Sequence, residues 1–178
     1  MTHKIILAGF GGQGILFAGK QLARFGMDAG KTVTWMPSYG PEQRGGTCNC
    51  SVIISDSDIS SPIIECPDIV VAFNAPSFEK FEPRVAKGGM LFADSTLIDK
   101  RSQRDDITCK YIPATDIVNS LNAGKMTNVV MLGYIMKCTN IFDPDTFGKS
   151  LTDSLPASKA ALAALNGACY KAGLEYSE

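Results

Sequence analysis

The sequence has 178 residues, of which 45% are hydrophobic and 20% are charged, and its formal net charge is −1 at pH 7. This length suits one α/β domain with a substantial core and is short for two, so we expect a single domain over residues 1–178. The scattered basic residues argue against a nucleic-acid partner, and no apolar run reaches the roughly 18 residues that span a membrane.

The first part of the chain predicts a strand, a helix and a second strand. Residues 4–8 form a continuous apolar run that ends in glycines, which is typical of a strand buried on both faces of a parallel sheet. Apolar residues recur at helical spacing over residues 15–29, and residues 32–35 begin a second strand. We expect a right-handed crossover between the two strands. Because the chain enters its first strand at once, we expect no signal peptide and a cytoplasmic protein.

The remainder predicts further strands and then mainly helices. Residues 127–137 are apolar on nearly every side, which is typical of a helix buried in a core or a subunit interface. Gly173 follows the last helical pattern and is expected to cap that helix. The expected strands are 50–55, 68–73, 90–93 and 108–112, and the expected helices are 77–84, 115–121, 127–137, 144–151 and 158–172. We therefore predict an α/β fold with a Rossmann-like, mostly parallel sheet, helices on both faces and a helical C-terminal third.

The turn after the first strand, residues 9–14, fits the pattern G-x-G-x-x-G. Such glycines let the backbone approach a ligand or a neighbouring helix, and the helix N-terminus offers N–H groups to an anion. A dinucleotide site would also place an acidic residue at the end of the second strand, where residues 34–37 read Thr-Trp-Met-Pro. Three interpretations stay open: a nicotinamide dinucleotide, a tight packing turn, and another anionic ligand or a partner chain.

Six cysteines are present, but none forms a Cys-x-x-Cys pair and no ferredoxin-type ligand run occurs. Cys48 and Cys50 share one face of a predicted strand, so they are either a reactive dithiol or small apolar fillers, and we favour the second interpretation. The one histidine, His3, lies near the N-terminus. We expect no metal site and no catalytic residue in this chain.

A second loop, residues 38–47, crowds glycine, proline, one aromatic residue and the charged Glu42 and Arg44 after a strand. In a parallel sheet, ligands and partners bind at that edge, although a solvated surface turn would explain the composition as well. The two loops and later segments resemble the gamma subunits of the 2-oxoacid:ferredoxin oxidoreductases. The similar stretches are Gly-Phe-Gly-Gly-Gln-Gly at 9–14, Pro-Ser-Tyr-Gly-Pro-Glu at 37–42, Arg-Gly-Gly-Thr at 44–47, Asn-Ala-Pro-Ser at 74–77 and Asn-Val-Val-Met-Leu-Gly at 128–133.

The resemblance implies a role in a complex that acts on 2-oxoglutarate, branched-chain 2-oxoacids or pyruvate. A 2-oxoacid, coenzyme A (CoA) and oxidised ferredoxin would give an acyl-CoA, CO2 and reduced ferredoxin. Thiamine diphosphate, Mg²⁺, iron–sulfur clusters and CoA would be bound in or between other subunits, and this chain alone would be inactive. The implied partners are alpha, beta and delta subunits, with ferredoxin reached through the complex. The alternatives are a self-standing Rossmann-type nucleotide- or dinucleotide-binding oxidoreductase and a non-catalytic scaffold subunit of another assembly.

We expect residues 9–14 and 38–47, together called the glycine-loop edge, to face the catalytic subunits and the CoA path. The backbone N–H groups of the first loop would approach an anion, and Arg44 would contact a phosphate or a partner carboxylate. Glu42 and Tyr39 would hold the second loop or bridge to a partner. The candidate binding residues are Gly9, Gly11, Gly12, Gln13, Gly14, Ser38, Tyr39, Glu42, Arg44, Gly45, Gly46 and Thr47.

Overall fold

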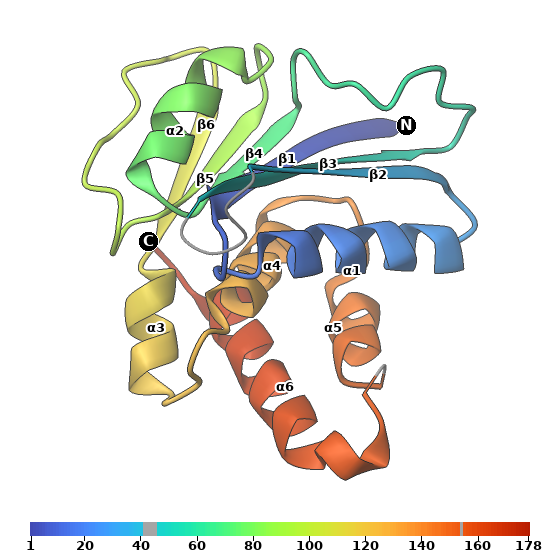
Figure 1. Ribbon diagram of the computed structural model, residues 1–178, viewed down its shortest axis with the longest axis vertical. Helices are drawn as coiled ribbons and strands as arrows, with labels where there is room; N and C mark the ends of the chain where they lie inside the picture. The colour runs from blue at the N-terminus through green and yellow to red at the C-terminus, as the bar shows by residue number, and fades with distance from the viewer. Residues whose placement is uncertain (41–45, 154) are drawn as a thin grey trace.

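A mixed β-sheet lies at the centre of the computed structural model, which describes residues 1–40, 46–153 and 155–178 (Figure 1). Within those residues its strands are ordered β2-β3-β1-β4-β5-β6. The strands are β1 Thr2–Phe10, β2 Thr32–Tyr39, β3 Thr47–Ser55, β4 Ile69–Ala72, β5 Met90–Asp94 and β6 Thr108–Ile112. The helices are α1 Ile15–Asp28, α2 Ala75–Phe81, α3 Ala114–Ser120, α4 Thr127–Cys138, α5 Pro144–Asp153 and α6 Ala160–Glu175, with short 3-10 turns η1 Glu82–Arg84 and η2 Ala157–Lys159.

β3 lies between the two strands of the predicted crossover unit, β1 and β2, which remain parallel to each other because both are antiparallel to β3. β1 pairs in parallel with β4, and β4 with β5 and β5 with β6 likewise, but β3 lies antiparallel between β1 and β2. The reason is burial. β3 is an apolar strand buried along most of its length, so it suits the inside of a sheet, whereas β2 is mostly exposed and suits the edge. β2 and β3 also extend into the segment predicted as a loop, so that Ser38, Tyr39 and Thr47 belong to strands.

Helices cover both faces of the sheet, as predicted (Figure 1). On one face, α2 and η1 pack Phe78, Phe81 and nearby side chains against alternate residues of β1, β4 and β5 such as Ile6 and Val70. On the other face, α1 and the C-terminal helices pack against the intervening strand residues, such as Leu7 and Val71. This alternation follows from the strand period of two residues, which sends successive side chains to opposite faces.

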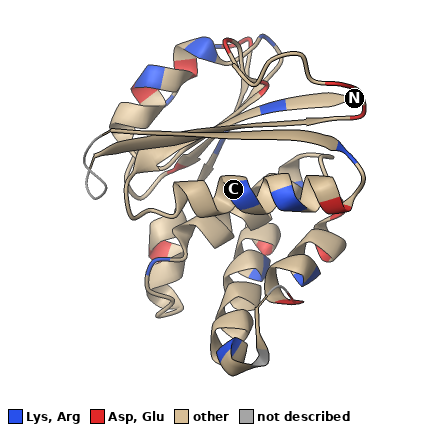
Figure 2. Cartoon of the chain, turned by 45° about the vertical axis from the view of Figure 1, so that its right-hand side comes forward, with Lys and Arg blue, Asp and Glu red and all other residues tan. Residues whose placement is uncertain are grey.

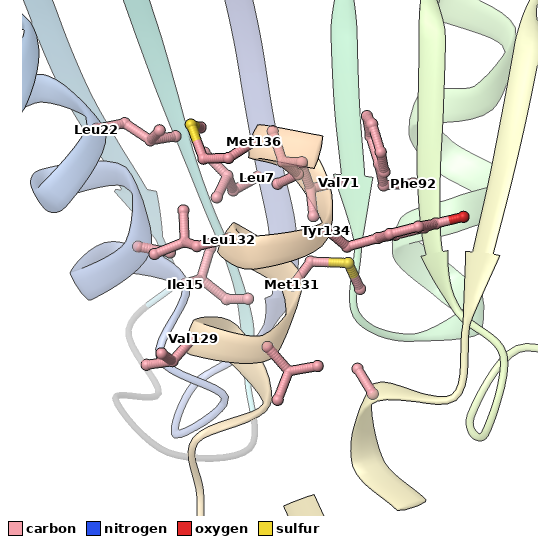
Figure 3. Close-up of a cluster of buried hydrophobic side chains, with 14 of the residues drawn as sticks. Leu7, Ile15, Leu22, Val71, Phe92, Val129, Met131, Leu132, Tyr134 and Met136 are labelled. Carbon is pink, nitrogen blue, oxygen red and sulfur yellow. The ribbon is translucent and has the colours of Figure 1, made fainter. Parts of the chain in front are cut away.

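Helix α4 lies at the centre of the larger core, and every residue from 128 to 136 is buried. Leu132 points toward the start of α1, and Tyr134 points toward Phe92 of β5, with ring centroids 5.8 Å apart (Figure 3). The prediction that this segment is a buried helix is confirmed.

The backbones of α4 and α6 approach closely where they cross. A Cβ atom at Gly173 would lie 1.9 Å from the carbonyl oxygen of Val130, and one at Gly133 would lie 2.1 Å from that of Tyr170. The predicted C-cap at Gly173 is therefore wrong. The helix continues to Glu175, and the glycine is needed because no side chain fits between the two helices.

Candidate functional site

The first glycine turn connects β1 to α1 and contains two left-handed residues, Gly12 at φ 100° and Gly14 at φ 76°. Gly14 is the N-cap of α1. A Cβ atom on Gly14 would lie 2.6 Å from Nδ2 of Asn128, whose amide donates to the Gly14 carbonyl at 3.3 Å. A Cβ atom on Gly9 would lie 2.6 Å from Oε1 of Gln13. Gly9 and Gly14 are thus required for packing, whereas the space at Gly12 is open.

Gln13 holds the turn in place from inside. Its Oε1 accepts a hydrogen bond from the backbone N–H of Phe10 at 2.7 Å, and its Nε2 donates to the carbonyl oxygen of Phe73 at 3.0 Å. The side chain of Asn74 also donates to Oε1 at 3.3 Å. Since both ends of the amide have partners in the protein, Gln13 ties the glycine turn to the end of β4, a role that the sequence pattern alone did not indicate.

The structure brings the two glycine-rich loops together. The backbone N–H of Gly11 donates to the carbonyl oxygen of Gly46 at 3.0 Å, and Phe10 pairs with Thr47 at the ends of β1 and β3. Ser38 lies in β2 opposite Asn49. The predicted site residues Glu42, Arg44 and Gly45 lie outside the described residues.

Next to this junction is a cleft of about 430 Å³. Of the predicted residues it includes Gly11, Gly12, Gly14 and Tyr39, while Gly9, Gln13, Ser38, Gly46 and Thr47 do not line it. The sequence pattern did not predict the apolar side chains that make its walls, although two phenylalanines that flank a glycine turn are an available signal. These walls are formed by Phe10, Ile15, Leu16, Phe17 and Cys48.

The cleft has no charged side chain among its described lining residues, and of these residues the backbone N–H groups at the start of α1 are the groups suited to an anion. Its cysteine is not activated. Burial raises the pKa of the Cys48 thiol, and burial raises that of Cys50 to about 12. Cys50 also donates a long hydrogen bond to the Ile15 carbonyl. Both thiols share one face of β3, as predicted; this is the α1 side, where they belong to the core.

Over residues 1–40, 46–153 and 155–178, no three His, Cys, Asp or Glu side chains are grouped as a metal ion would require. None of the helices in the same ranges combines the length and hydropathy of a membrane-crossing segment.

The fold and the glycine turn define a Rossmann-like α/β module with an apolar cleft at the carboxyl end of β1. The chain belongs to the pyruvate ferredoxin/flavodoxin oxidoreductase family, whose family model matches residues 4–176.

Named relatives agree with this membership. The chain is 35% identical to the 2-oxoglutarate synthase subunit KorC of Methanocaldococcus jannaschii, over 88% of this chain and 85% of that protein. It is 35% identical to the ketoisovalerate oxidoreductase subunit VorA of Methanothermobacter thermautotrophicus over 98% of this chain, but it spans only 36% of that protein. The crystal structure of a keto/oxoacid ferredoxin oxidoreductase gamma subunit from Geobacter sulfurreducens matches with a TM-score of 0.83 and 25% identity, over 98% of this chain and 95% of that one.

Proposed function

We propose that this chain is the gamma-type subunit of a cytoplasmic, multi-subunit 2-oxoacid:ferredoxin oxidoreductase. The observation that carries the proposal is the family match over residues 4–176, supported by a KorC relative that the chain matches over most of both lengths. The complex would convert a 2-oxoacid, CoA and oxidised ferredoxin into an acyl-CoA, CO2 and reduced ferredoxin. Alpha, beta and delta subunits would be the partners of this chain.

We assign thiamine diphosphate, Mg²⁺ and the iron–sulfur clusters to the other subunits, and CoA to the space in or between subunits. The cleft at the glycine turn fits part of a CoA molecule, because its volume of about 430 Å³ lies within the usual range of small-molecule sites. The phenylalanine walls suit an apolar arm, and the first amides of α1 suit a phosphate. When bound, CoA supplies the thiol that receives the acyl group; the residues of this chain would bind and orient it.

A self-standing dinucleotide-binding enzyme is the weaker alternative, for a geometric reason. In a dinucleotide fold the acidic residue that binds the ribose follows a strand next to the glycine-turn strand. Here β3 lies between β2 and β1, so the end of β2 is two strand spacings, about 10 Å, from the end of β1. The last residue of β2 is Tyr39, which is not an acid.

The test is purification of the native complex through a tag on this chain, followed by an assay of 2-oxoacid- and CoA-dependent reduction of ferredoxin or a viologen dye. Activity in a complex that contains thiamine- and cluster-bearing chains supports the proposal. An inactive chain that millimolar NAD, NADP or FAD protects against thermal unfolding would instead identify the dinucleotide-binding alternative, because a ligand that binds the native state stabilises it. An intact multi-subunit complex without this activity would identify a scaffold.

A further inference from the structure

The first turn of α1 borders the cleft, and its own residues do not cap it. The first backbone N–H groups of a helix have no partner within that helix. The N-cap of α1 is Gly14, which has no side chain to accept from them, and the first turn contains no acidic residue. In Figure 2 the charged residues of α1 lie beyond this turn. How well these amides can bind an anion therefore depends on what holds Gly14 in place.

Asn128, in the first turn of α4, packs directly against Gly14. Its Nδ2 donates to the Gly14 carbonyl oxygen at 3.3 Å. A Cβ atom on Gly14 would lie 2.6 Å from Nδ2, 2.7 Å from Cγ and 3.1 Å from Oδ1 of Asn128, so the whole amide group lies against this glycine. The side chain is buried, with only 5% of the residue exposed. In Figure 3 the start of α4, marked by Val129, lies beside the start of α1, marked by Ile15.

The contact acts on a single peptide group at the cleft. The Gly14 carbonyl and the Ile15 N–H belong to one planar peptide unit, so a bond that fixes the direction of the oxygen also fixes the direction of the N–H. Gly14 has a φ of 76°, and a glycine backbone is freer to move than that of any other residue. Gly14 and Ile15 both line the cleft. Asn128 thus restrains the peptide unit at which the glycine turn becomes a helix.

An ordinary packing role does not explain an amide at this position. The next residues of α4, 129–133, are Val-Val-Met-Leu-Gly, and burying a polar side chain among them costs free energy unless it gains a hydrogen bond. The Gly14 carbonyl does not need Asn128 as a partner, because the N–H of Ala18 already donates to it at 3.0 Å. An apolar side chain would fill the space, but it would not fix the peptide unit.

We propose that Asn128 is a positioning residue for CoA. It orients the Gly14–Ile15 peptide unit, and through it the first N–H groups of α1, toward a phosphate of CoA in the cleft. This inference rests on the proposed function and adds to it a residue that does not line the cleft. A residue that acts in this way affects the binding of CoA and leaves the binding of the 2-oxoacid unchanged.

The test uses the native complex, purified through a tag on this chain. Asn128→Leu keeps the branched shape of asparagine and removes the donor. Asn166→Leu on α6 is the matched control, because Asn166 is also buried and does not line the cleft. Isothermal titration calorimetry gives the Kd for CoA, and the ferredoxin-reduction assay gives kcat and the KM for each substrate.

We expect Asn128→Leu to raise the Kd and the KM for CoA roughly three- to ten-fold, as for the loss of one hydrogen bond or helix-terminus contact. The KM for the 2-oxoacid is expected to stay unchanged, and the control is expected to keep the wild-type Kd for CoA. If Asn128→Leu does not assemble into the complex, Asn128→Ser is measured in the same way, since its shorter side chain does not reach the Gly14 carbonyl.

A variant complex that binds CoA with the wild-type Kd overturns the role of Asn128. An equal rise in the KM for both substrates, or an equal rise in the Kd for the control, also overturns it, because either result indicates a general loss of structure. A wild-type complex that neither binds CoA nor reduces ferredoxin rejects the proposed function itself. An active wild-type complex with an insensitive variant rejects only this inference.

Discussion

The backbone N–H of Gly11 donates to the carbonyl oxygen of Gly46 at 3.0 Å, and this bond joins two loops that lie 35 positions apart in the chain. It places the turn that precedes α1 against the segment that precedes β3. The glycine-loop edge is therefore one surface, and changes in either loop are expected to act on the other.

Gln13→Ala is expected to destabilise the protein. The substitution removes the acceptor of the Phe10 N–H and the donor to the Phe73 carbonyl, and a typical intramolecular hydrogen bond contributes about 0.5–1.5 kcal/mol to stability. Urea denaturation measures the change, and Gln21→Ala on α1 is the control. Equal stability of the two variants would show that the amide of Gln13 does not hold the turn.

Gly173→Ala is expected to cost about 1–3 kcal/mol or more, because the new methyl group would overlap the Val130 carbonyl. Gly167→Ala in the same helix is the matched control, since its Cβ would meet only an ordinary contact at 3.5 Å. The control is expected to be neutral or stabilising by up to about 1 kcal/mol from helix propensity. Thermal or chemical denaturation of both variants separates crowding from propensity, and a stable Gly173→Ala protein would contradict the close crossing of α4 and α6.

Native cysteine labelling is expected to distinguish buried from exposed thiols. At pH 8, the exposed Cys66 should react with iodoacetamide, while Cys50 should react only after denaturation, because it is fully buried and its pKa is raised to about 12. Mass spectrometry of labelled peptides gives the order of reaction. Rapid formation of a Cys48–Cys50 disulfide under mild oxidation would favour the dithiol interpretation instead.

Arg44→Ala is expected to raise the KM for CoA or to weaken assembly of the complex. Position 44 lies outside the described residues, so this prediction depends on the resemblance and on the affinity of guanidinium groups for phosphates and carboxylates. Arg24→Ala, on the exposed side of α1, is the control. Unchanged assembly together with an unchanged KM for CoA would remove Arg44 from the site.

Local patterns were enough to predict most elements of this fold. The predictions of strands β1, β4 and β5 and of helix α4 were correct. An element that is buried on all sides needs apolar residues at nearly every position, and a short stretch of sequence shows this directly. The insertion of β3 between β1 and β2 was missed, since strand order depends on pairing between distant segments. The role of Gly173 was predicted wrongly for a similar reason. The sequence pattern alone does not distinguish a glycine that ends a helix from one that allows a neighbouring helix to approach closely.

The candidate site was predicted in part. The glycine pattern correctly indicated a turn before α1, and the structure brings Tyr39 of the second segment to its cleft. The pattern did not reveal that Gln13 turns inward or that Phe10 and Phe17 form cleft walls, because the direction of a side chain in a tight turn depends on its tertiary partners.

The unequal edges of the sheet limit how copies of this chain can associate. Glu178 occupies one backbone donor of β6, whereas no described segment pairs with the outer side of β2, so β2 offers the longer run of free strand groups among the described residues. Two copies that met through β2 would use the same surface on each and form a closed pair. Each copy would then cover the uncharged β2 of the other, which removes that strand as a starting point for further strand pairing.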